Sequence, residues 1–301
     1  MLTYFLGANT RNGFYSLYDG FPPDNSFLHV IKGGPGTGKS SLMRRVALAG
    51  EAKGLSVHRV LCSGDPDSLD AVWIPDLGQA WVDGTAPHIL EPKLFGVNGD
   101  YLELGAFLFC PFSAREKAEL LAMQAAYRDK YRQAYELLAK CEAPGEAWKI
   151  SEYGEASSEP AVHLLPKEKA GKCARLFRGA VTCKGLVRSE ALPADWKCVR
   201  CSPGALQKTK ERALSLGYRV IDCPHPLDPA ISEAVLLPEE KLCLEQPVDL
   251  RAGTRDLLAQ AVTLLREAKA IHDRMELCYR EHMDFDGISE MAEKLIAKLF
   301  E

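Results

Sequence analysis

Short apolar runs alternate with a stretch of helical periodicity in the first part of the chain. Phe27–Ile31 and Ser56–Cys62 are mostly apolar and β-prone, as in strands that are buried on both faces. Between them, residues 41–49 carry apolar side chains at helical spacing, which predicts a helix that stops at Gly50 or Gly54. We therefore expect an α/β fold with a parallel sheet flanked by helices.

The pattern occurs twice. Phe5–Phe14 is similar to Phe177–Leu186, and Gly54–Cys62 is similar to Leu216–Cys223. Each copy continues with an Asp five residues after the Cys and an apolar run that ends in Pro and an acid: Asp67 and Asp228, Pro75-Asp76 and Pro238-Glu239. Self-similarity of this kind predicts two related halves. A chance similarity is the alternative.

Each half ends in a long helical extension. Ser113 and Glu116 have the spacing of a capping box, and helical periodicity continues to Cys141. The matching segment of the second half is Thr254–Met283. We expect the two to pack together as a helical layer or lid. A tyrosine stripe on the first helix favours this packing over base stacking; it comprises Tyr127, Tyr131 and Tyr135.

The stretch Glu155–Pro160 has the composition of a linker. We place the domain boundary there. Residues 1–155 are predicted to form a P-loop nucleotide-binding domain with a helical extension. Residues 156–301 are predicted to form a degenerate P-loop-like repeat, also with a helical extension.

A glycine-rich loop, residues 33–40, lies between the predicted first strand and helix. It fits the phosphate-binding pattern G-x-x-x-x-G-K-[ST] at every fixed position. Glycines let backbone N–H groups point at phosphate oxygens, and the following helix adds its positive end. Lys39 would contact the β- and γ-phosphates, and the Ser40 hydroxyl would bind Mg²⁺. The predicted nucleotide-binding residues are Gly33, Gly34, Pro35, Gly36, Thr37, Gly38, Lys39, Ser40 and Ser41.

A P-loop site also needs a carboxylate for the metal, usually at the end of a second apolar strand. Asp83 ends the run Gln79–Asp83 and is our preferred magnesium ligand; Asp76 is the alternative, although Pro75 disfavours a central strand. Asp65 is a candidate catalytic residue, since it or Asp67 could orient a water or a substrate hydroxyl. The competing interpretation of this loop is helix capping by Asp67 and Asp70.

The second half lacks the phosphate-binding pattern. Where the first half has Gly-Lys-Ser, the second has Leu206-Gln207-Lys208, and Leu206 would place a Cβ where phosphate must approach. We expect this half to have lost its own nucleotide site. Its C-x-x-C motif could instead belong to a zinc site of atypical spacing, with Cys198, Cys201, Cys223 and His225 as ligands.

Composition excludes several classes of protein. The 301 residues carry a net charge of −4, which makes a nucleic-acid partner unexpected. No apolar run reaches the roughly 18 residues of a membrane-spanning helix, and the start resembles no secretory signal. Ten cysteines are too sparse for a disulfide scaffold. We expect a cytoplasmic protein with reduced thiols.

The chain resembles an uncharacterised family of bacterial ATPase-like proteins with two P-loop halves in tandem. The matching segments are Phe5–Thr10, Lys32–Ser40, Cys62–Asp70, Trp81–His88, Ala268–Asp273 and Tyr279. The resemblance implies a tandem architecture over nearly the whole chain. Members usually carry a second phosphate loop, which this sequence lacks.

The nucleotide is expected to be ATP, because no Asn-Lys-x-Asp segment for guanine occurs. Gly84 follows Asp83, so the acidic pair that activates water in many ATPases is missing. We therefore expect a slow or partner-stimulated Mg²⁺-dependent ATPase. One alternative is a kinase for a small molecule held near Asp65, Asp67 and His88. The other is a nucleotide-sensing module without turnover.

Overall fold

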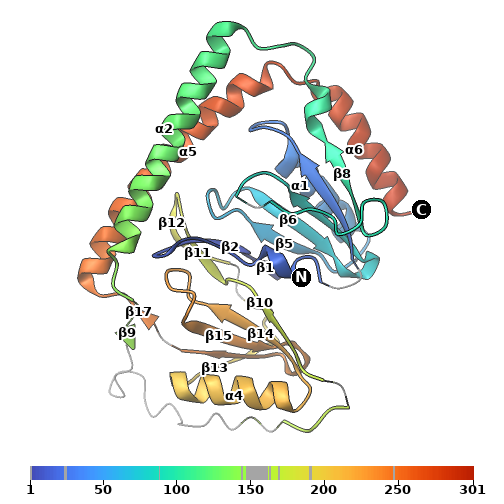
Figure 1. The fold of residues 1–301 in the computed structure, drawn as a ribbon. Helices are drawn as coiled ribbons and strands as arrows, with labels where there is room; N and C mark the ends of the chain where they lie inside the picture. Colours follow the sequence, from blue (N-terminus) through green and yellow to red (C-terminus); the bar gives the residue numbers. More distant parts are fainter. Residues whose placement is uncertain are drawn as a thin grey trace.

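The computed structural model describes residues 2–23, 26–87, 89–143, 145–146, 162, 164–168, 170–189, 192–246 and 248–301. The fold is α/β, with mixed sheets flanked by helices (Figure 1). The first half contains a six-stranded sheet in the order β1-β5-β6-β7-β4-β8. Its elements are β1 (Leu2–Tyr4), β4 (Phe27–Lys32), α1 (Lys39–Ala52), β5 (His58–Leu61), β6 (Leu69–Ile74), β7 (Gln79–Asp83) and β8 (Gly99–Glu103).

The sheet is mixed, so the prediction of a parallel sheet is wrong for one strand. β6 runs antiparallel to both β5 and β7, whereas β4 pairs in parallel with β7 and β8. Short connections cause the reversal. Only residues 62–68 join β5 to β6, and the 3-10 turn Pro75–Leu77 with Gly78 joins β6 to β7. A parallel crossover needs a dozen or more residues.

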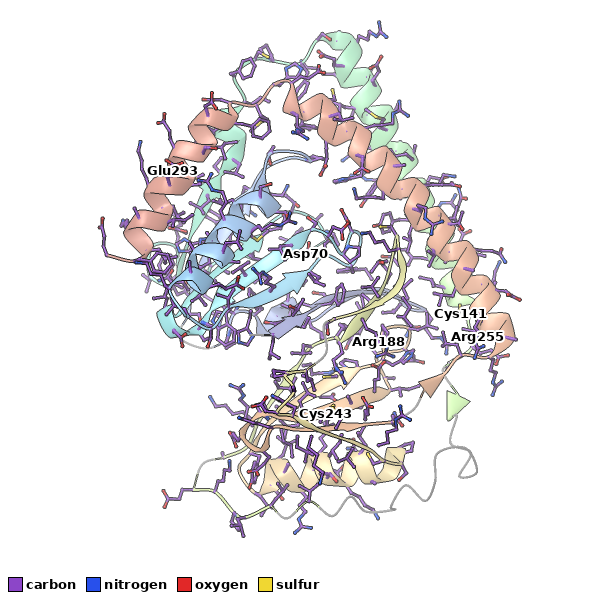
Figure 2. The ribbon with its side chains drawn as sticks, turned by 180° about the vertical axis from the view of Figure 1, so that it is seen from behind. Asp70, Cys141, Arg188, Cys243, Arg255 and Glu293 are labelled. Carbon is purple, nitrogen blue, oxygen red and sulfur yellow. The ribbon has the colours of Figure 1, made fainter. Side chains whose placement is uncertain are left out.

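The second half repeats this arrangement. Its five-stranded sheet has the order β10-β14-β15-β16-β13, and the central β15 is again antiparallel to both neighbours. The elements are β10 (Lys172–Arg175), β13 (Lys197–Arg200), α4 (Pro203–Ser215), β14 (Arg219–Pro224), β15 (Ser232–Leu237) and β16 (Leu242–Glu245). Figure 2 shows Asp70 on the first sheet and Cys243 on the second.

A local backbone feature fixes the correspondence between the halves. Gly78 and Lys241 each follow a 3-10 turn that begins with proline, and both have left-handed backbone conformations. Each carbonyl then accepts a hydrogen bond from the first residue of the equivalent strand, Phe27 or Lys197. The predicted repeat therefore appears in the strand order, the strand directions and the turns.

Two hairpins lie where the halves meet, next to an antiparallel bridge between Phe5 and Phe177. They are β2–β3 (Gly7–Thr10, Gly13–Ser16) and β11–β12 (Gly179–Thr182, Gly185–Arg188). The Phe5 N–H donates to the Phe177 carbonyl, and the Phe177 N–H donates to the Phe5 carbonyl, both at 2.9 Å. Both rings are fully buried. The hairpins thus build a shared core between the two sheets.

Two long helices, which we call the strap helices, lie along both halves. α2 (Ala114–Ala139) and α5 (Ala252–Arg280) lie side by side on one flank (Figure 1). Ser113 and Glu116 form the predicted capping box at the start of α2. α6 (Phe285–Leu299) follows α5 and packs its apolar face on α1. The expectation of a packed helical layer is confirmed.

The proposed boundary at residues 155 and 156 lies outside the described residues. Within the described part of the chain, no helix is both long and apolar enough to cross a membrane.

Candidate functional site

The glycine-rich loop joins β4 to α1 and has a curled backbone. Gly36 and Gly38 have φ angles of 69° and 92°, in the left-handed region that favours glycine. The loop ends at the start of α1, where no side chain caps the helix. By contrast, the serine or aspartate before each of α2, α4 and α6 caps that helix. The first N–H groups of α1 therefore have no side-chain partner, as in an anion-binding helix terminus.

Lys39 lies between the loop and an acid. Its ammonium donates to the carbonyls of Gly33 and Gly34 at 2.9 and 2.8 Å. It also lies 3.7 Å from Oδ2 of Asp83, and both side chains are largely buried. Oδ1 of Asp83 is held by the backbone N–H and the hydroxyl of Thr85. Lys39 and Asp83 are therefore brought together, as the sequence predicted.

Burial raises the pKa of the Asp83 carboxyl, while Lys39 and Thr85 act in the opposite direction. Strand direction explains why Asp83 is near the loop. β4 and β7 are parallel in a register that pairs Ile31 with Asp83, so both strands end at the same edge. β6 runs the other way, so Asp76 lies at the far edge. There Asp76 accepts a hydrogen bond from the Ser56 N–H.

A second buried acid, Asp70, was missed as a site residue. The sequence suggested a helix cap, but Asp70 lies in strand β6 and is 4 % exposed. The antiparallel pairing of β6 and β7 ends at Ala71 and Val82, so the next residues, Asp70 and Asp83, lie close together, and the Asp70 charge helps to raise the pKa of Asp83. Tyr18 donates to Oδ2 of Asp70 at 3.1 Å. The signal was a polar residue within an otherwise apolar strand.

The loop before β6 contains the two other candidate acids. Asp65 accepts a hydrogen bond from the Asp67 N–H, so it stabilises a turn rather than a helix, and the capping interpretation is wrong. The Asp65 side chain lies 3.3 Å from Lys269 of α5. Asp67 is exposed and forms an ion pair with Lys184 of the β11–β12 turn. Asp65 is thus the one that faces the strap helix.

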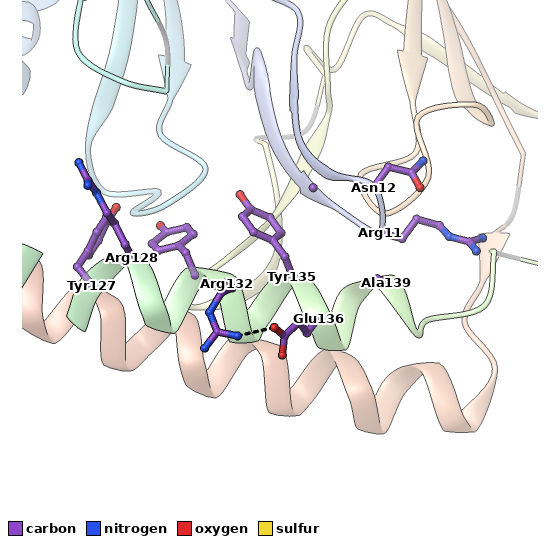
Figure 3. A pocket seen from close by; sticks show the side chains of 10 residues that line it. Arg11, Asn12, Tyr127, Arg128, Arg132, Tyr135, Glu136 and Ala139 are labelled. Carbon is purple, nitrogen blue, oxygen red and sulfur yellow. Dashed lines mark hydrogen bonds and ion pairs between the residues drawn. The ribbon is translucent and has the colours of Figure 1, made fainter. Parts of the chain in front are cut away.

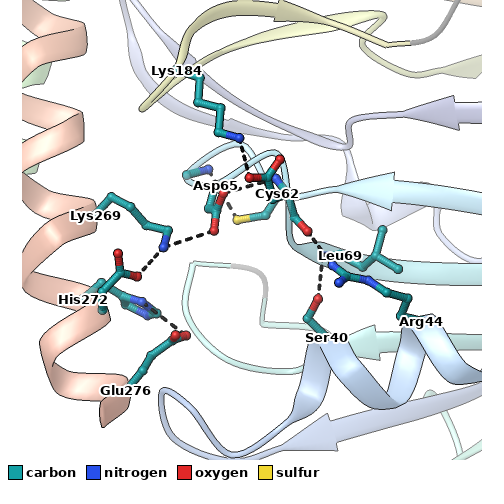
Figure 4. A network of polar contacts seen from close by, with 12 residues as sticks. Ser40, Arg44, Cys62, Asp65, Leu69, Lys184, Lys269, His272 and Glu276 are labelled. Atoms are coloured by element: carbon teal, nitrogen blue, oxygen red, sulfur yellow. Dashed lines mark hydrogen bonds and ion pairs between the residues drawn. The ribbon is translucent and has the colours of Figure 1, made fainter. Parts of the chain in front are cut away.

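Oxygen-bearing side chains of the type that Mg²⁺ prefers lie at this edge of the sheet. Ser40 accepts a hydrogen bond from the Leu69 N–H at 2.9 Å, which holds its oxygen next to the start of β6 (Figure 4). Hydroxyl and carboxylate oxygens are ligands that Mg²⁺ prefers. Ser40 and Asp83 would hold the ion, with Asp70 as a further carboxylate at the same edge.

Helix α5 packs directly on the loop, which sequence reasoning did not anticipate. A Cβ added to Gly36 would lie 2.6 Å from the backbone carbonyl oxygen of Glu276. A Cβ added to Gly34 would lie 2.7 Å from the ring of Tyr279. The two glycines therefore allow the helix to approach, in addition to any phosphate.

The same helix adds charged groups to this edge. In Figure 4 the Lys269 side chain extends from α5 to Asp65, and His272 and Glu276 lie one turn apart on the same helix. Burial lowers the pKa of His272; the carboxylates of Glu276 and Asp273 act in the opposite direction, and the cations Lys269 and Lys39 lower it. In the described part of the chain, His272, Asp273 and Glu276 are the group whose spacing could hold a metal. Lys269 already pairs with the Asp273 carboxylate.

The second half has no equivalent loop. Only Cys201 and Ser202 separate β13 from α4, and the Ser202 side chain caps that helix. Leu206 lies inside α4, with its side chain in the core, so it does not occupy a loop position. The residue equivalent to Asp83 is Gln246, counted from the matched turns. Within residues 192–246, both the glycine-rich loop and a carboxylate equivalent to Asp83 are therefore missing.

The four proposed zinc ligands are not gathered. Among the residues described, the group with metal-ligand spacing lies on α5 and contains none of them, so the structure gives the zinc alternative no support. Cys198 is exposed on β13, whereas Cys201 and Cys223 are buried. His225 is buried too, and its Nδ1 accepts from the Leu227 N–H. His88, a candidate for a kinase site, lies outside the described residues.

The tyrosine stripe packs against α5 but also lines an open hollow of about 630 Å³ (Figure 3). The hollow lies between α2 and the β2–β3 turn, and Arg11, Arg128 and Arg132 contribute to it. None of its lining residues belongs to the glycine-rich loop. Arg11 pairs with Asp228, and Arg132 pairs with acids on its own helix.

Comparisons with known proteins add nothing to this geometry: no family model, no curated protein and no solved structure matches the chain.

Proposed function

We propose that the chain binds ATP and Mg²⁺ at the glycine-rich loop and hydrolyses ATP slowly. The observation that carries the proposal is the Lys39–Asp83 pair, 3.7 Å apart, at the uncapped start of α1. A cation for phosphate and a carboxylate for metal, next to free helix N–H groups, are the parts of a P-loop site. The fold is then of the P-loop type, in the tandem family that the sequence resembles.

Slow turnover follows from the acids that surround the pair. No acid follows Asp83 in the sequence, and the two candidate carboxylates Asp70 and Asp65 are bonded to Tyr18 and Lys269. Neither is therefore a free base for water. Lys269 is on a helix of the second half, so a movement of α5 would release Asp65. This arrangement supports an ATPase that a partner can stimulate through α5.

The first experiment is nucleotide binding, measured as a thermal shift with a non-hydrolysable ATP analogue and Mg²⁺. At a ligand concentration about 100 times Kd, binding stabilises the fold by about 3 kcal/mol, which shifts the melting temperature by about 4–5 °C for a chain of 301 residues. Lys39→Ala should abolish the shift relative to its own baseline. Lys208→Ala is the matched control, because Lys208 is the exposed lysine of the degenerate segment.

Product analysis then separates the three functions. Basal phosphate release that Lys39→Ala abolishes supports the ATPase. Turnover that requires a metabolite from an acceptor panel identifies a kinase instead. A thermal shift without any product identifies a nucleotide-sensing module. No shift with millimolar ATP or GTP overturns the whole proposal.

A further inference from the structure

A cysteine, a histidine and a glutamate form a connected cluster where the strap helices meet the first half. Cys110 Sγ lies 2.9 Å from Nδ1 of His282, and Nε2 of His282 lies 3.0 Å from Oε1 of Glu116. The three residues come from the segment before α2, the end of α5 and the first turn of α2. None of them takes part in the nucleotide site.

Backbone pairing holds the cluster together. The Phe109 N–H donates to the His282 carbonyl, and the Asp284 N–H donates to the Phe107 carbonyl. The Phe112 ring packs against the imidazole with centroids 4.3 Å apart. These contacts fix the position of the imidazole between thiol and carboxylate. His282 itself is 7 % exposed.

The charge on Glu116 suits a buried imidazolium. Hydrogen bonds from Ser113, and a smaller effect of His282, lower the pKa of Glu116 to about 2. The carboxylate is therefore ionised at neutral pH and can accept the Nε2 proton. The Nδ1 proton then faces sulfur, so a protonated His282 would be paired on both sides. A nucleophile, a base and a group that orients the base are the parts of an activated cysteine site.

Cys110 is also reachable from solvent. It is half-buried, and its neighbours Leu108 and Phe109 are 37 % and 65 % exposed. Cys173 and Cys198 are more exposed than Cys110, and the groups that act on them are not a histidine: burial raises the pKa of Cys173 despite nearby Lys210, and Cys198 faces Cys243. They provide internal controls within the same chain.

We propose that Cys110 is a reactive thiol, that His282, oriented by Glu116, takes its proton as sulfur reacts, and that hydrogen peroxide oxidises it to a sulfenic acid. The thiolate sulfur attacks one peroxide oxygen, an S–O bond forms and the O–O bond breaks. The leaving hydroxide takes the proton of the His282 imidazolium and departs as water. Cysteine loses two electrons and peroxide gains them, so no further reactant is needed.

The test treats the whole chain with hydrogen peroxide, traps sulfenic acid with a 1,3-diketone and follows each cysteine by peptide mass spectrometry. An ordinary thiol is only a few per cent ionised at pH 7. A thiolate reacts faster, although its lower basicity removes part of the gain. Cys110 should therefore react roughly tenfold faster than Cys173 and Cys198.

Glu116→Gln is the decisive variant, because Gln keeps the capping box and removes only the charge. It should slow Cys110 several-fold, and His282→Gln should bring it to the rate of the control cysteines. Between pH 6 and 8 the His282→Gln rate should depend on pH more steeply than the wild-type rate, because the variant lacks the base that takes the Cys110 proton. The other titratable groups near the cluster are Glu119 on α2 and Cys278, Tyr279 and Glu281 on α5.

Two results would overturn the proposal. One is a Cys110 rate no higher than that of Cys173 and Cys198 in the wild type. The other is a fast rate that both variants leave unchanged. The measurement needs no nucleotide, so it fails or succeeds independently of the ATPase proposal.

Discussion

The Lys39–Asp83 pair can be tested as an interaction within the protein, without nucleotide. The perturbation is a double-mutant cycle of Lys39→Met, Asp83→Asn and the two together. Methionine keeps most of the lysine stem, and asparagine keeps the hydrogen bonds of Asp83 with Thr85. Each single variant therefore removes mainly one charge. The quantity of interest is the difference between the double variant and the sum of the singles.

The structure sets the expected size of the coupling. Two unit charges about 4 Å apart attract by about 4 kcal/mol at the effective dielectric constant of about 20 found in proteins. The charged atoms are 3.7 Å apart, and the side chains are 11 % and 17 % exposed, so water reduces the attraction only in part. We expect a coupling of about 2 kcal/mol. Lys39→Met should lose most stability, since it leaves a buried carboxylate without its cation.

Asp83→Asn alone should cost less than Lys39→Met, because Lys39 keeps its hydrogen bonds to the carbonyls of Gly33 and Gly34 and because the change removes the burial penalty that raises the Asp83 pKa. A carboxyl whose folded pKa lies above its unfolded value loses stability as pH rises through that interval. Without Lys39 the folded pKa rises further, so the deficit of Lys39→Met should shrink as pH falls from 7 towards 5. The assay is urea unfolding of the four proteins at both pH values. The reasoning is refuted if the losses of unfolding free energy of the two single variants sum to within about 0.5 kcal/mol of the loss of the double variant. It is also refuted if the loss of Lys39→Met does not change with pH.

Three further substitutions test the loop, the junction and the second half. Gly36→Ala should lower the unfolding free energy, measured in urea, by more than the roughly 1–2 kcal/mol of a left-handed alanine, because its Cβ would also meet the α5 backbone. Gly54→Ala is the control: Gly54 has a φ of 74° and open space around it, so this variant should show the conformational cost alone. Phe177→Ala should cost about 3–5 kcal/mol by the same measurement, since the ring is fully buried between the halves. Ser202→Ala should cost about 1 kcal/mol by removing the α4 cap, yet leave the nucleotide thermal shift unchanged; a lost shift would contradict our interpretation of the second half.

The parts of the site that sequence could predict are those encoded locally. The loop pattern identified Lys39 and Ser40 within eight residues. Asp83 followed from an apolar run that ends in an acid and a glycine, which marks the exposed end of a buried strand. The repeat was visible because equivalent turns keep the same residues, such as the proline that precedes Gly78 and Lys241.

The missed parts depend on strand direction and on distant segments. Asp70 looked like a cap because the sequence does not state that β6 reverses, which alone brings it close to Asp83. Tyr279 and Glu276 are more than 230 residues from the loop, and their approach depends on how α5 crosses the first half. The zinc alternative finds no support for a related reason. Cys201 and Cys223 serve as small apolar side chains in separate core clusters.

Helix α5 belongs to the second half and contacts the glycine-rich loop of the first half. Under the proposed function, the second half would therefore influence phosphate binding there, although its own equivalent of the site is degenerate. Its equivalent of the loop is too short, and Gln246 replaces the carboxylate, so it cannot bind a nucleotide in the same way. Nevertheless, α5 begins after its last strand and ends on Gly34 and Gly36. A phosphate that enters the loop must therefore be accommodated by this helix as well. Because packed helices shift as units, any partner that moves α5 would alter the affinity of the loop for phosphate, and by linkage the nucleotide would alter the affinity for that partner.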